Sequence, residues 1–215
     1  MLTPRPPEAM PAAHDMVFRS LRARIMYGEI APGRALTLRG IGKEYGVSMT
    51  PAREAVRRLV AEGALFLSSS GRVSTPELTA ERIEELSALR ALLEVELSSR
   101  ALPRAHMALI DRLQSINASI SDTIAARDAV GYIRSNLEFH RTLYLRAQAP
   151  AILAMAETVW LQLGPTMRAL YDRLQRTDPP HFHRLIIAAL KAGDEPGLRL
   201  AVRSDVTQGL RMLVA

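Results

Sequence analysis

The sequence contains no cysteine, which excludes disulfide bonds and thiolate metal sites within the chain. Long apolar runs are also missing, since no stretch approaches the roughly 20 residues that a helix needs to cross a bilayer. The first ten residues lack the apolar core of a secretory signal peptide. We therefore expect a cytoplasmic protein that has no membrane partner.

Positive charge is concentrated in the first third of the chain. Residues 1–75 hold 11 Lys/Arg and 6 Asp/Glu, whereas residues 76–215 hold 17 and 16. Such asymmetry favours a polyanionic partner for the N-terminal segment. A solvated basic surface would give the same charge count, so the motif that carries the charge has to decide between them.

The N-terminal pattern predicts a tail and then helices. Residues 1–13 contain four prolines and are expected to form a flexible tail. After them, Val17, Leu21 and Ile25 recur at helical spacing, and residues 37–46 predict a second, shorter helix.

A third helix and a hairpin follow. The stretch GVSMTPAREAVRRLVAEG predicts a turn and then a helix, with Thr50 as its cap and Pro51 at the first helical position. The next stretch, LFLSSSGRVST, predicts two short strands around a Ser/Gly turn. Three short helices followed by a hairpin are typical of a winged helix-turn-helix, which we assign to residues 14–75.

A winged helix-turn-helix places the start of its third helix in the major groove of DNA and its wing near the minor groove. Arg53 can bond guanine or hold a phosphate, and Arg39 can clamp the DNA backbone. The predicted DNA-contacting residues are Arg39, Ser48, Met49, Thr50, Arg53, Gly71 and Arg72. A solvated helix face is the competing explanation, which we favour for Arg58 but not for Arg53.

The rest of the chain predicts helices alone. Between residues 76 and 215, apolar residues follow helical spacing through six segments. These segments are 77–100, 104–126, 128–147, 150–176, 180–192 and 195–214. Because short connections join them, we expect an antiparallel bundle. The predicted fold is mainly α, a winged helix-turn-helix joined to an all-helical bundle.

Four polar residues of the predicted bundle are candidates for a cation site. Asn136 and His140 are four residues apart and face the same side of one helix, while His183 and Asp205 lie on the last two helices. A bundle can gather two imidazoles, a carboxylate and an amide around a metal. The same spacing also suits histidines that are hydrogen-bonded in a core, so both interpretations stay open.

The segments LRARIMYGEIAPGRAL, GVSMTPAREAVRRLVAEGAL and SSSGRV, in this order, resemble the GntR family of bacterial regulators. The helical half is similar to the FCD effector domain of FadR-type members, in its six-helix form. The resemblance implies a transcription regulator, not an enzyme, that binds a two-fold operator as a homodimer and responds to a small carboxylate. Family members usually carry arginine where Met49 stands and Glu-Leu-Ala where Gly40-Ile41-Gly42 stands, which leaves the operator sequence open.

The FCD resemblance also implies a metal site. The family supplies an aspartate, a histidine four residues later, and one histidine on each of the last two helices. By position these fall on Asn136, His140, His183 and Asp205, so two of the four ligands differ. Two His and one Asp are good ligands for Zn, Ni, Mn or Fe, and an Asn oxygen is a weaker one. We expect a divalent metal that anchors the effector or pins the fold.

Arg90 and Glu94 match, by spacing, an arginine and a glutamate early in the family's helical domain. Arg90 can pair with an effector carboxylate through its guanidinium fork, although an intrahelical pair with Glu94 fits the spacing equally well. Two other functions stay open for the helical half. One is a metal-dependent enzyme, since two His and one Asp leave open coordination positions, and the other is a dimerisation module without a ligand.

Overall fold

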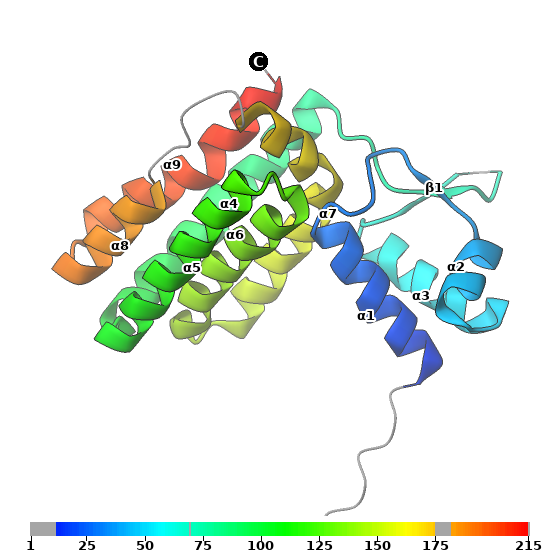
Figure 1. Cartoon of the computed structure of the whole chain (residues 1–215), viewed down its shortest axis with the longest axis horizontal. Coiled ribbons are helices and arrows are strands. Elements are labelled where there is room, and N and C mark those ends of the chain that lie inside the picture. The colour runs from blue at the N-terminus through cyan, green and yellow to red at the C-terminus, as the bar shows by residue number, and fades with distance from the viewer. Residues whose placement is uncertain (1–11, 69, 175–181, 215) are drawn as a thin grey trace, which may run out of the picture.

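The computed structural model describes residues 12–68, 70–174 and 182–214 of the chain. A small N-terminal part, drawn in blue and cyan in Figure 1, stands beside a larger bundle of helices. Helices dominate both parts, which confirms the predicted mainly-α class. Within the described residues, no helix has the length and apolarity needed to span a membrane. Of the predicted tail, residues 1–11 lie outside the described part.

The N-terminal part contains three helices and three strands. They are α1 (Ala13–Met26), β1 (Ala35–Leu36), α2 (Leu38–Tyr45), α3 (Met49–Ala61), β2 (Phe66–Leu67) and β3 (Val73–Ser74). The side chain of Thr37 caps α2 by accepting a hydrogen bond from the backbone N–H of Gly40 at 2.9 Å. Gly46 then ends α2 in the left-handed conformation, with a φ of 65°, which only glycine adopts at little cost.

The sheet is larger than the sequence predicts. Strands β2 and β3 form the expected antiparallel wing, but β1 also pairs with β3, so the strand order is β1-β3-β2. Strand β1 has only two residues, which is too short to show the alternation of apolar and polar residues that identifies a strand.

Helix α3 begins earlier than predicted. Its first residue is Met49 and Ser48 occupies the N-cap position, so Thr50 is not the cap and Pro51 is the third helical residue. Proline is tolerated there because the first N–H groups of a helix have no partner within the helix. Met49 therefore lies in the exposed first turn of α3.

Arg58, which we expected on a solvated helix face, is half-buried and contacts α1. It forms an ion pair with Asp15 at 2.6 Å, and its guanidinium lies 3.7 Å from the centre of the Phe18 ring. Both partners are on α1, so this contact joins α1 to α3. Beneath it, the predicted core residues Leu21 and Leu59 are fully buried.

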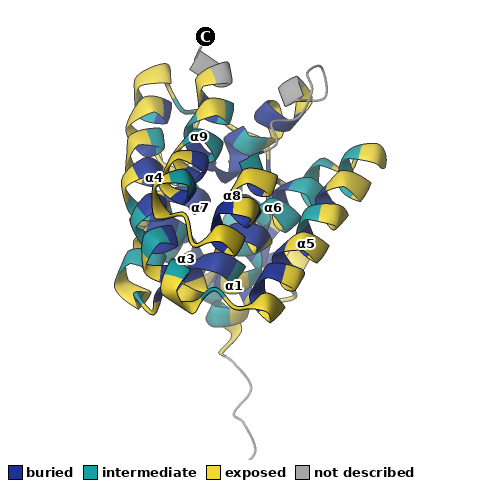
Figure 2. Ribbon diagram, turned by 90° about the vertical axis from the view of Figure 1, so that its left-hand side faces the viewer, coloured by how far each residue is buried: buried dark blue, intermediate teal, exposed yellow. Residues whose placement is uncertain are grey.

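The bundle contains the six predicted helices, each ending within three residues of its expected limits. They are α4 (Ala80–Ala101), α5 (Met107–Ala125), α6 (Ala129–Tyr144), α7 (Pro150–Leu174), α8 (Phe182–Ala192) and α9 (Glu195–Val214), with short 3-10 turns at Leu102–Arg104 and Leu145–Ala147. Helix α7 continues through Pro165. Figure 2 shows that buried residues lie on the faces where the helices meet.

The two parts of the molecule meet where α7 passes the C-terminal end of α1. Gly164 of α7 lies so close that an added Cβ would come within 2.2 Å of the Ile25 carbonyl oxygen and 2.8 Å of the Met26 Cα. Opposite it, Gly28 has a φ of 68° and faces the Gly164 carbonyl. Glycine at both positions permits this backbone-to-backbone approach.

We predict that Gly164→Ala destabilises the protein although alanine is the better helix former. Helix propensity alone would stabilise α7 by about 1 kcal/mol. The clash with backbone atoms of α1 outweighs this gain and leaves a net loss of about 1–3 kcal/mol. Urea unfolding measures the change. In the control variant Gly209→Ala, the added methyl meets only the flexible end of Leu170, at 3.1 Å, so a loss as large as that of Gly164→Ala would contradict the prediction.

Candidate functional site

All the predicted DNA-contacting residues are exposed. These residues are Arg39, Ser48, Met49, Thr50, Arg53, Gly71 and Arg72. Among the described residues, neither Arg39, Arg53 nor Arg72 forms an ion pair, in contrast to Arg58. Their charges are therefore free to meet a polyanion.

The geometry of α3 and the wing explains this exposure. Ala52, Val56 and Leu59 bury one face of α3, which turns Arg53 to the opposite, exposed face. Met49 stands at the start of that face with 45% of its surface exposed. At the tip of the wing, Gly71 adopts a φ of 81°, which lets the chain reverse before Arg72.

Three of the four predicted metal ligands come together in the bundle. His140 of α6, His183 of α8 and Asp205 of α9 each offer one ligand atom, and these atoms lie within 4.8 Å of one another. The Nε2 atom of His140 is 3.0 Å from Asp205 Oδ2, and the Nε2 atom of His183 is 3.8 Å from the same oxygen. Asn136 lies one turn before His140 on α6 and is half-buried.

Hydrogen bonds fix the tautomer of His140. Glu94 accepts the hydroxyl proton of Tyr144 at 3.0 Å, so the Tyr144 oxygen can only accept from His140 Nδ1, which lies 3.1 Å away. The proton of the neutral imidazole is then on Nδ1, and Nε2 presents its lone pair to Asp205. Two electron-pair donors at 3.0 Å repel each other unless a cation or a proton lies between them.

His183 has the same arrangement. Its Nδ1 donates to Asn117 Oδ1 at 3.2 Å, and Phe139 stacks on its ring with the centroids 3.9 Å apart. Its Nε2 is therefore also a bare lone pair. Within the described part of the chain, neither His140 Nε2 nor His183 Nε2 has a hydrogen-bond partner of acceptable geometry. Three donors thus converge on one point, which is the arrangement that a divalent metal requires.

A buried glutamate joins this cluster to the rest of the bundle. Glu94 is fully buried and accepts from Arg90 Nε at 2.5 Å, from Tyr144 and from Trp160 Nε1 at 2.9 Å. Arg90 is also buried, so the intrahelical pair that the spacing allowed is present. An effector-binding role for Arg90 stays a prediction.

The electrostatics keep Asp205 ionised and His183 neutral near neutral pH. Burial opposes the charge on Asp205, but the His183 and His140 imidazoles and the Arg90 guanidinium outweigh it and lower its pKa to about 2. Burial also lowers the pKa of His183 to about 4, against the smaller opposing effect of Asp205. Near neutral pH, His183 is therefore a neutral ligand beside a carboxylate.

Sequence reasoning missed several residues of this network. Tyr144 follows His140 by four residues, so helical spacing could have identified it. Trp160 is the only tryptophan of the sequence, but nothing in the sequence shows that its indole reaches Glu94. No sequence pattern identifies Asn117 as part of the network, because its partner His183 is 66 residues away along the chain.

The comparisons with known proteins agree with both halves of the molecule. The family model of the bacterial regulatory proteins of the gntR family matches residues 13–73, and that of the FCD domain matches residues 85–208. The chain therefore belongs to the GntR family of bacterial regulatory proteins and carries an FCD domain.

Relatives and solved structures give the same result. The HTH-type transcriptional regulator McbR of Escherichia coli K12 is 27% identical, over 92% of this chain and 90% of its own length. The gluconate operon transcriptional repressor of Bacillus subtilis is 31% identical over 69% of this chain, which spans 59% of that protein. The structure of E. coli McbR/YncC matches with a TM-score of 0.84 at 25% identity, covering 95% of this chain and 98% of the other. These relatives are transcription regulators and not enzymes.

The depressed pKa of His183 predicts how the metal-free protein responds to acid. Because the unfolded chain takes up a proton near pH 6.5 and the folded chain near pH 4, folding stability is complete above 6.5 and falls as the pH drops toward 4. Over this pH range the free energy of unfolding falls by about 3 kcal/mol. Urea unfolding of chelator-treated protein across this window measures it.

His183→Gln should remove most of this pH dependence, whereas His106→Gln, which replaces an exposed histidine, should retain it. If the unfolding free energy changes with pH equally in wild type and His183→Gln, burial of His183 is not the cause of the pH dependence.

Proposed function

We propose that the protein is a ligand-responsive transcription regulator that binds a two-fold operator as a homodimer. The observation that carries the proposal is the union, in one chain, of an exposed recognition helix with unpaired arginines and a bundle with a buried cluster of metal-ligand atoms. Belonging to the GntR family supports it. The proposal places the protein in the cytoplasm, where operator DNA is accessible.

Double-stranded DNA is the proposed partner of the N-terminal part. Helix α3 would enter the major groove with Ser48, Met49, Thr50 and Arg53 toward base edges and phosphates. Arg39 would hold the DNA backbone, and Gly71 with Arg72 would bring the wing to the minor groove. Since Met49 donates no hydrogen bond, it would make apolar contacts where an arginine would read a base.

A homodimer supplies the geometry that a single recognition helix lacks. A two-fold pair of chains can place two α3 helices about 34 Å apart, which is one turn of duplex DNA. Operator half-sites with that spacing would then be bound together.

The proposed cofactor is a divalent metal, with Zn, Ni, Mn and Fe as the candidates. His140, His183 and Asp205 would hold it, and Asn136 would supply a weaker fourth ligand. In a tetrahedral site with bonds of about 2.0–2.1 Å, the ligand atoms lie about 3.3 Å apart, so the present spacing of up to 4.8 Å needs only a small contraction. A bound metal would act as a Lewis acid that attracts a carboxylate.

The proposed effector is a small carboxylate that binds beside the metal. The sequence suggests Arg90 as its second anchor, but the Arg90 guanidinium already donates twice to Glu94, at 2.5 and 3.3 Å. Its direct contact with an effector would require this buried pair to open. We therefore propose that Arg90 holds Glu94 in position, and that Glu94 in turn orients His140 through Tyr144.

Helix α7 provides the route from the cluster to the recognition helix. Trp160 of α7 donates to Glu94 in the cluster. One half-turn later, Gln162 donates to the backbone carbonyl of Glu62, which is the C-cap of α3, and accepts from Arg82 of α4 at 2.8 Å. A ligand that shifts α7 would move both contacts, so effector and operator affinity would be coupled.

Two alternatives remain less well supported. A metal-dependent enzyme leaves the exposed recognition helix without a role, and the relatives are regulators. A dimerisation module without a ligand leaves the convergence of three lone-pair donors unexplained. Metal analysis of the purified protein separates this second alternative from the proposal.

We predict that Arg53→Gln weakens binding to the DNA upstream of the protein's own gene by about tenfold or more, because a charge-assisted contact is lost. If Arg53 contacts a DNA phosphate, the slope of log affinity against log salt concentration should also fall in magnitude by about one. Fluorescence anisotropy in the presence of competitor DNA measures both quantities.

Lys191→Gln on α8 is the matched control, since it removes an exposed cation from the bundle and should leave affinity unchanged. A wild-type protein that forms no salt-sensitive, competitor-resistant complex would contradict the DNA-binding proposal.

We also predict that the purified protein binds about one divalent metal ion per chain, because three ligand atoms converge on one point. Asp205→Asn and His140→Gln should each lower the affinity by about tenfold or more, since one ligand is weakened or lost. Asn136→Asp should raise it by restoring a carboxylate.

Elemental analysis of protein prepared without a histidine tag, together with the melting temperature in added Zn, Ni, Mn or Fe, provides the test. His106→Gln should bind metal like wild type. Absence of metal and of any shift in melting temperature would leave the cluster as a hydrogen-bonded core and overturn the metal site.

A further inference from the structure

We infer that the cleft between α1 and the α6–α7 pair is a second small-molecule site, with a preference for an aromatic carboxylate. Its volume is about 460 Å³, which lies within the roughly 300–1,000 Å³ of small-molecule sites in proteins. The residues that line it come from α1, α6, α7 and the turn after α6. None of His140, His183 and Asp205 is among them, so this site is distinct from the metal cluster.

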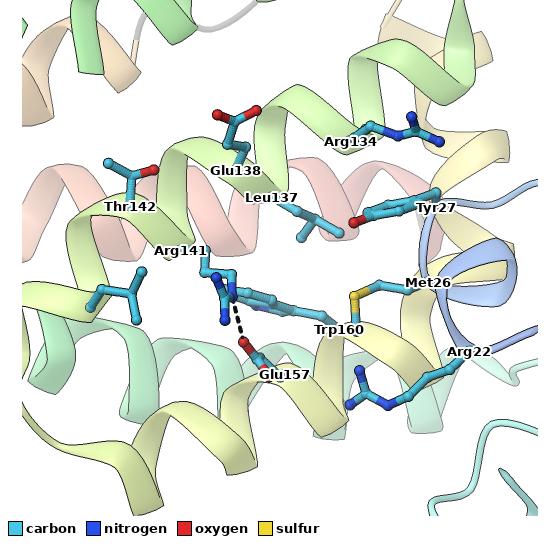
Figure 3. A pocket seen from close by; sticks show the side chains of 11 residues that line it. Arg22, Met26, Tyr27, Arg134, Leu137, Glu138, Arg141, Thr142, Glu157 and Trp160 are labelled. Atoms are coloured by element: carbon cyan, nitrogen blue, oxygen red, sulfur yellow. Dashed lines mark hydrogen bonds and ion pairs between the residues drawn. The ribbon is translucent and has the colours of Figure 1, made fainter. Parts of the chain in front are cut away.

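An aromatic and apolar surface forms the middle of the cleft. In Figure 3, Trp160 lies at the centre of the group, with Leu137 and Met26 beside it and Tyr27 beyond them. Trp160 and Met26 line the cleft although both are buried, with 3% and 9% of their surfaces exposed, so a flat apolar ligand would meet only an edge of the ring and of the thioether. This surface is shared by both halves of the molecule, because Met26 is the last residue of α1 and Tyr27 is its C-cap.

Two arginines stand on either side of Trp160 (Figure 3). Arg22 donates its Nε to Glu62 at 2.8 Å, and Arg141 donates its Nε to Glu157 at 2.8 Å. Among the described residues, the terminal amino groups of both forks make no hydrogen bond. Each fork is thus held in place by one bond and keeps the donors that recognise a carboxylate.

The third arginine of the lining is the least neutralised. Arg134 lies over the Tyr27 ring, 4.9 Å from its centre, and its contact with Glu29 is 3.6 Å long, which exceeds a hydrogen bond. Glu29 is also shared with Arg24. Stacking on Tyr27 fixes the guanidinium plane at the rim of the cleft while its donors stay uncommitted.

The two glutamates of the lining do not oppose an anion. Glu138 is bound by Arg112 of α5 at 2.5 Å, outside the cleft, and in Figure 3 it points away from Trp160. Glu157 is neutralised by Arg141. With these carboxylates paired, the remaining N–H groups of the arginines are the charged donors at the cleft, and they favour a carboxylate over a cation or a neutral ring.

Occupancy of the cleft would act on both halves at once. A ring that rests on Trp160 touches the residue whose indole N–H bonds Glu94, and its carboxylate meets Arg22 on α1. The ligand would therefore hold α1 against the bundle. This regulatory consequence rests on the proposed function, whereas binding to the cleft does not.

Trp160 makes the site directly measurable, because it is the only tryptophan of the protein. The probe is anilinonaphthalene sulfonate, a fluorescent aromatic anion, with excitation that selects tryptophan. We expect saturable energy transfer from Trp160 with one probe per chain. Naphthoate should displace the probe at about one tenth of the concentration needed for naphthol, which has the same rings without the carboxylate.

Arg22→Gln and Arg141→Gln should each weaken probe and naphthoate binding by about tenfold, because a charge-assisted contact is lost. Arg199→Gln, an exposed arginine of α9 that also forms an ion pair with a glutamate, should bind like wild type. Leu200→Gln should do the same, although Leu200 lines an apolar groove between α8 and α9. A melting curve of each variant verifies that it is folded, and Arg141, which is 55% exposed, decides the test if Arg22→Gln does not fold.

Three outcomes would overturn the inference. They are the absence of energy transfer from Trp160, equal displacement by naphthoate and naphthol, and probe binding that Leu200→Gln removes while the arginine variants retain it. DNA is absent from these measurements, so their failure is distinguishable from failure of the proposed function.

Discussion

The bundle depends on one buried carboxylate. Glu94 has no exposed surface, and burial of a lone charge costs several kcal/mol. The side chains that donate hydrogen bonds to it are therefore held in place. Arg90 of α4, Tyr144 of α6 and Trp160 of α7 all donate to it. Through Tyr144 it also sets the tautomer of His140, so that the lone pair on His140 Nε2 faces Asp205.

The same carboxylate lies at the beginning of the route between the two halves. Trp160 links it to α7, and Gln162 of α7 bonds the last turn of the recognition helix through the Glu62 carbonyl. Gly164 then brings α7 into backbone contact with α1. Three successive contacts on one helix therefore tie the cluster, the recognition helix and α1 together, and a change at the cluster has a physical path to the DNA-binding face.

The helices were predictable because their apolar residues repeat every three to four positions and prolines or glycines separate them. The exposed arginines of α3 followed from the same periodicity. Strand β1 was not predictable, because two residues carry no period and its pairing with β3 is non-local. For the candidate cluster, spacing and resemblance pointed to His140, His183 and Asp205, whereas Asn117 and Trp160 reach it only through the packing of separate helices. For Arg90 the spacing allowed both an effector contact and a pair with Glu94, and only the packing shows that the buried pair is present.

We propose that the cluster and the recognition helix are coupled through α7. Operator affinity, measured with zinc-loaded and with chelator-treated protein, tests it most directly when wild type is compared with Gln162→Ala. We expect zinc to change the operator affinity of the wild type by about tenfold, and the ratio of zinc-loaded to metal-free affinity to move toward one in Gln162→Ala. The same ratio in both proteins, or no effect of zinc on a wild-type protein that binds the metal, would contradict it.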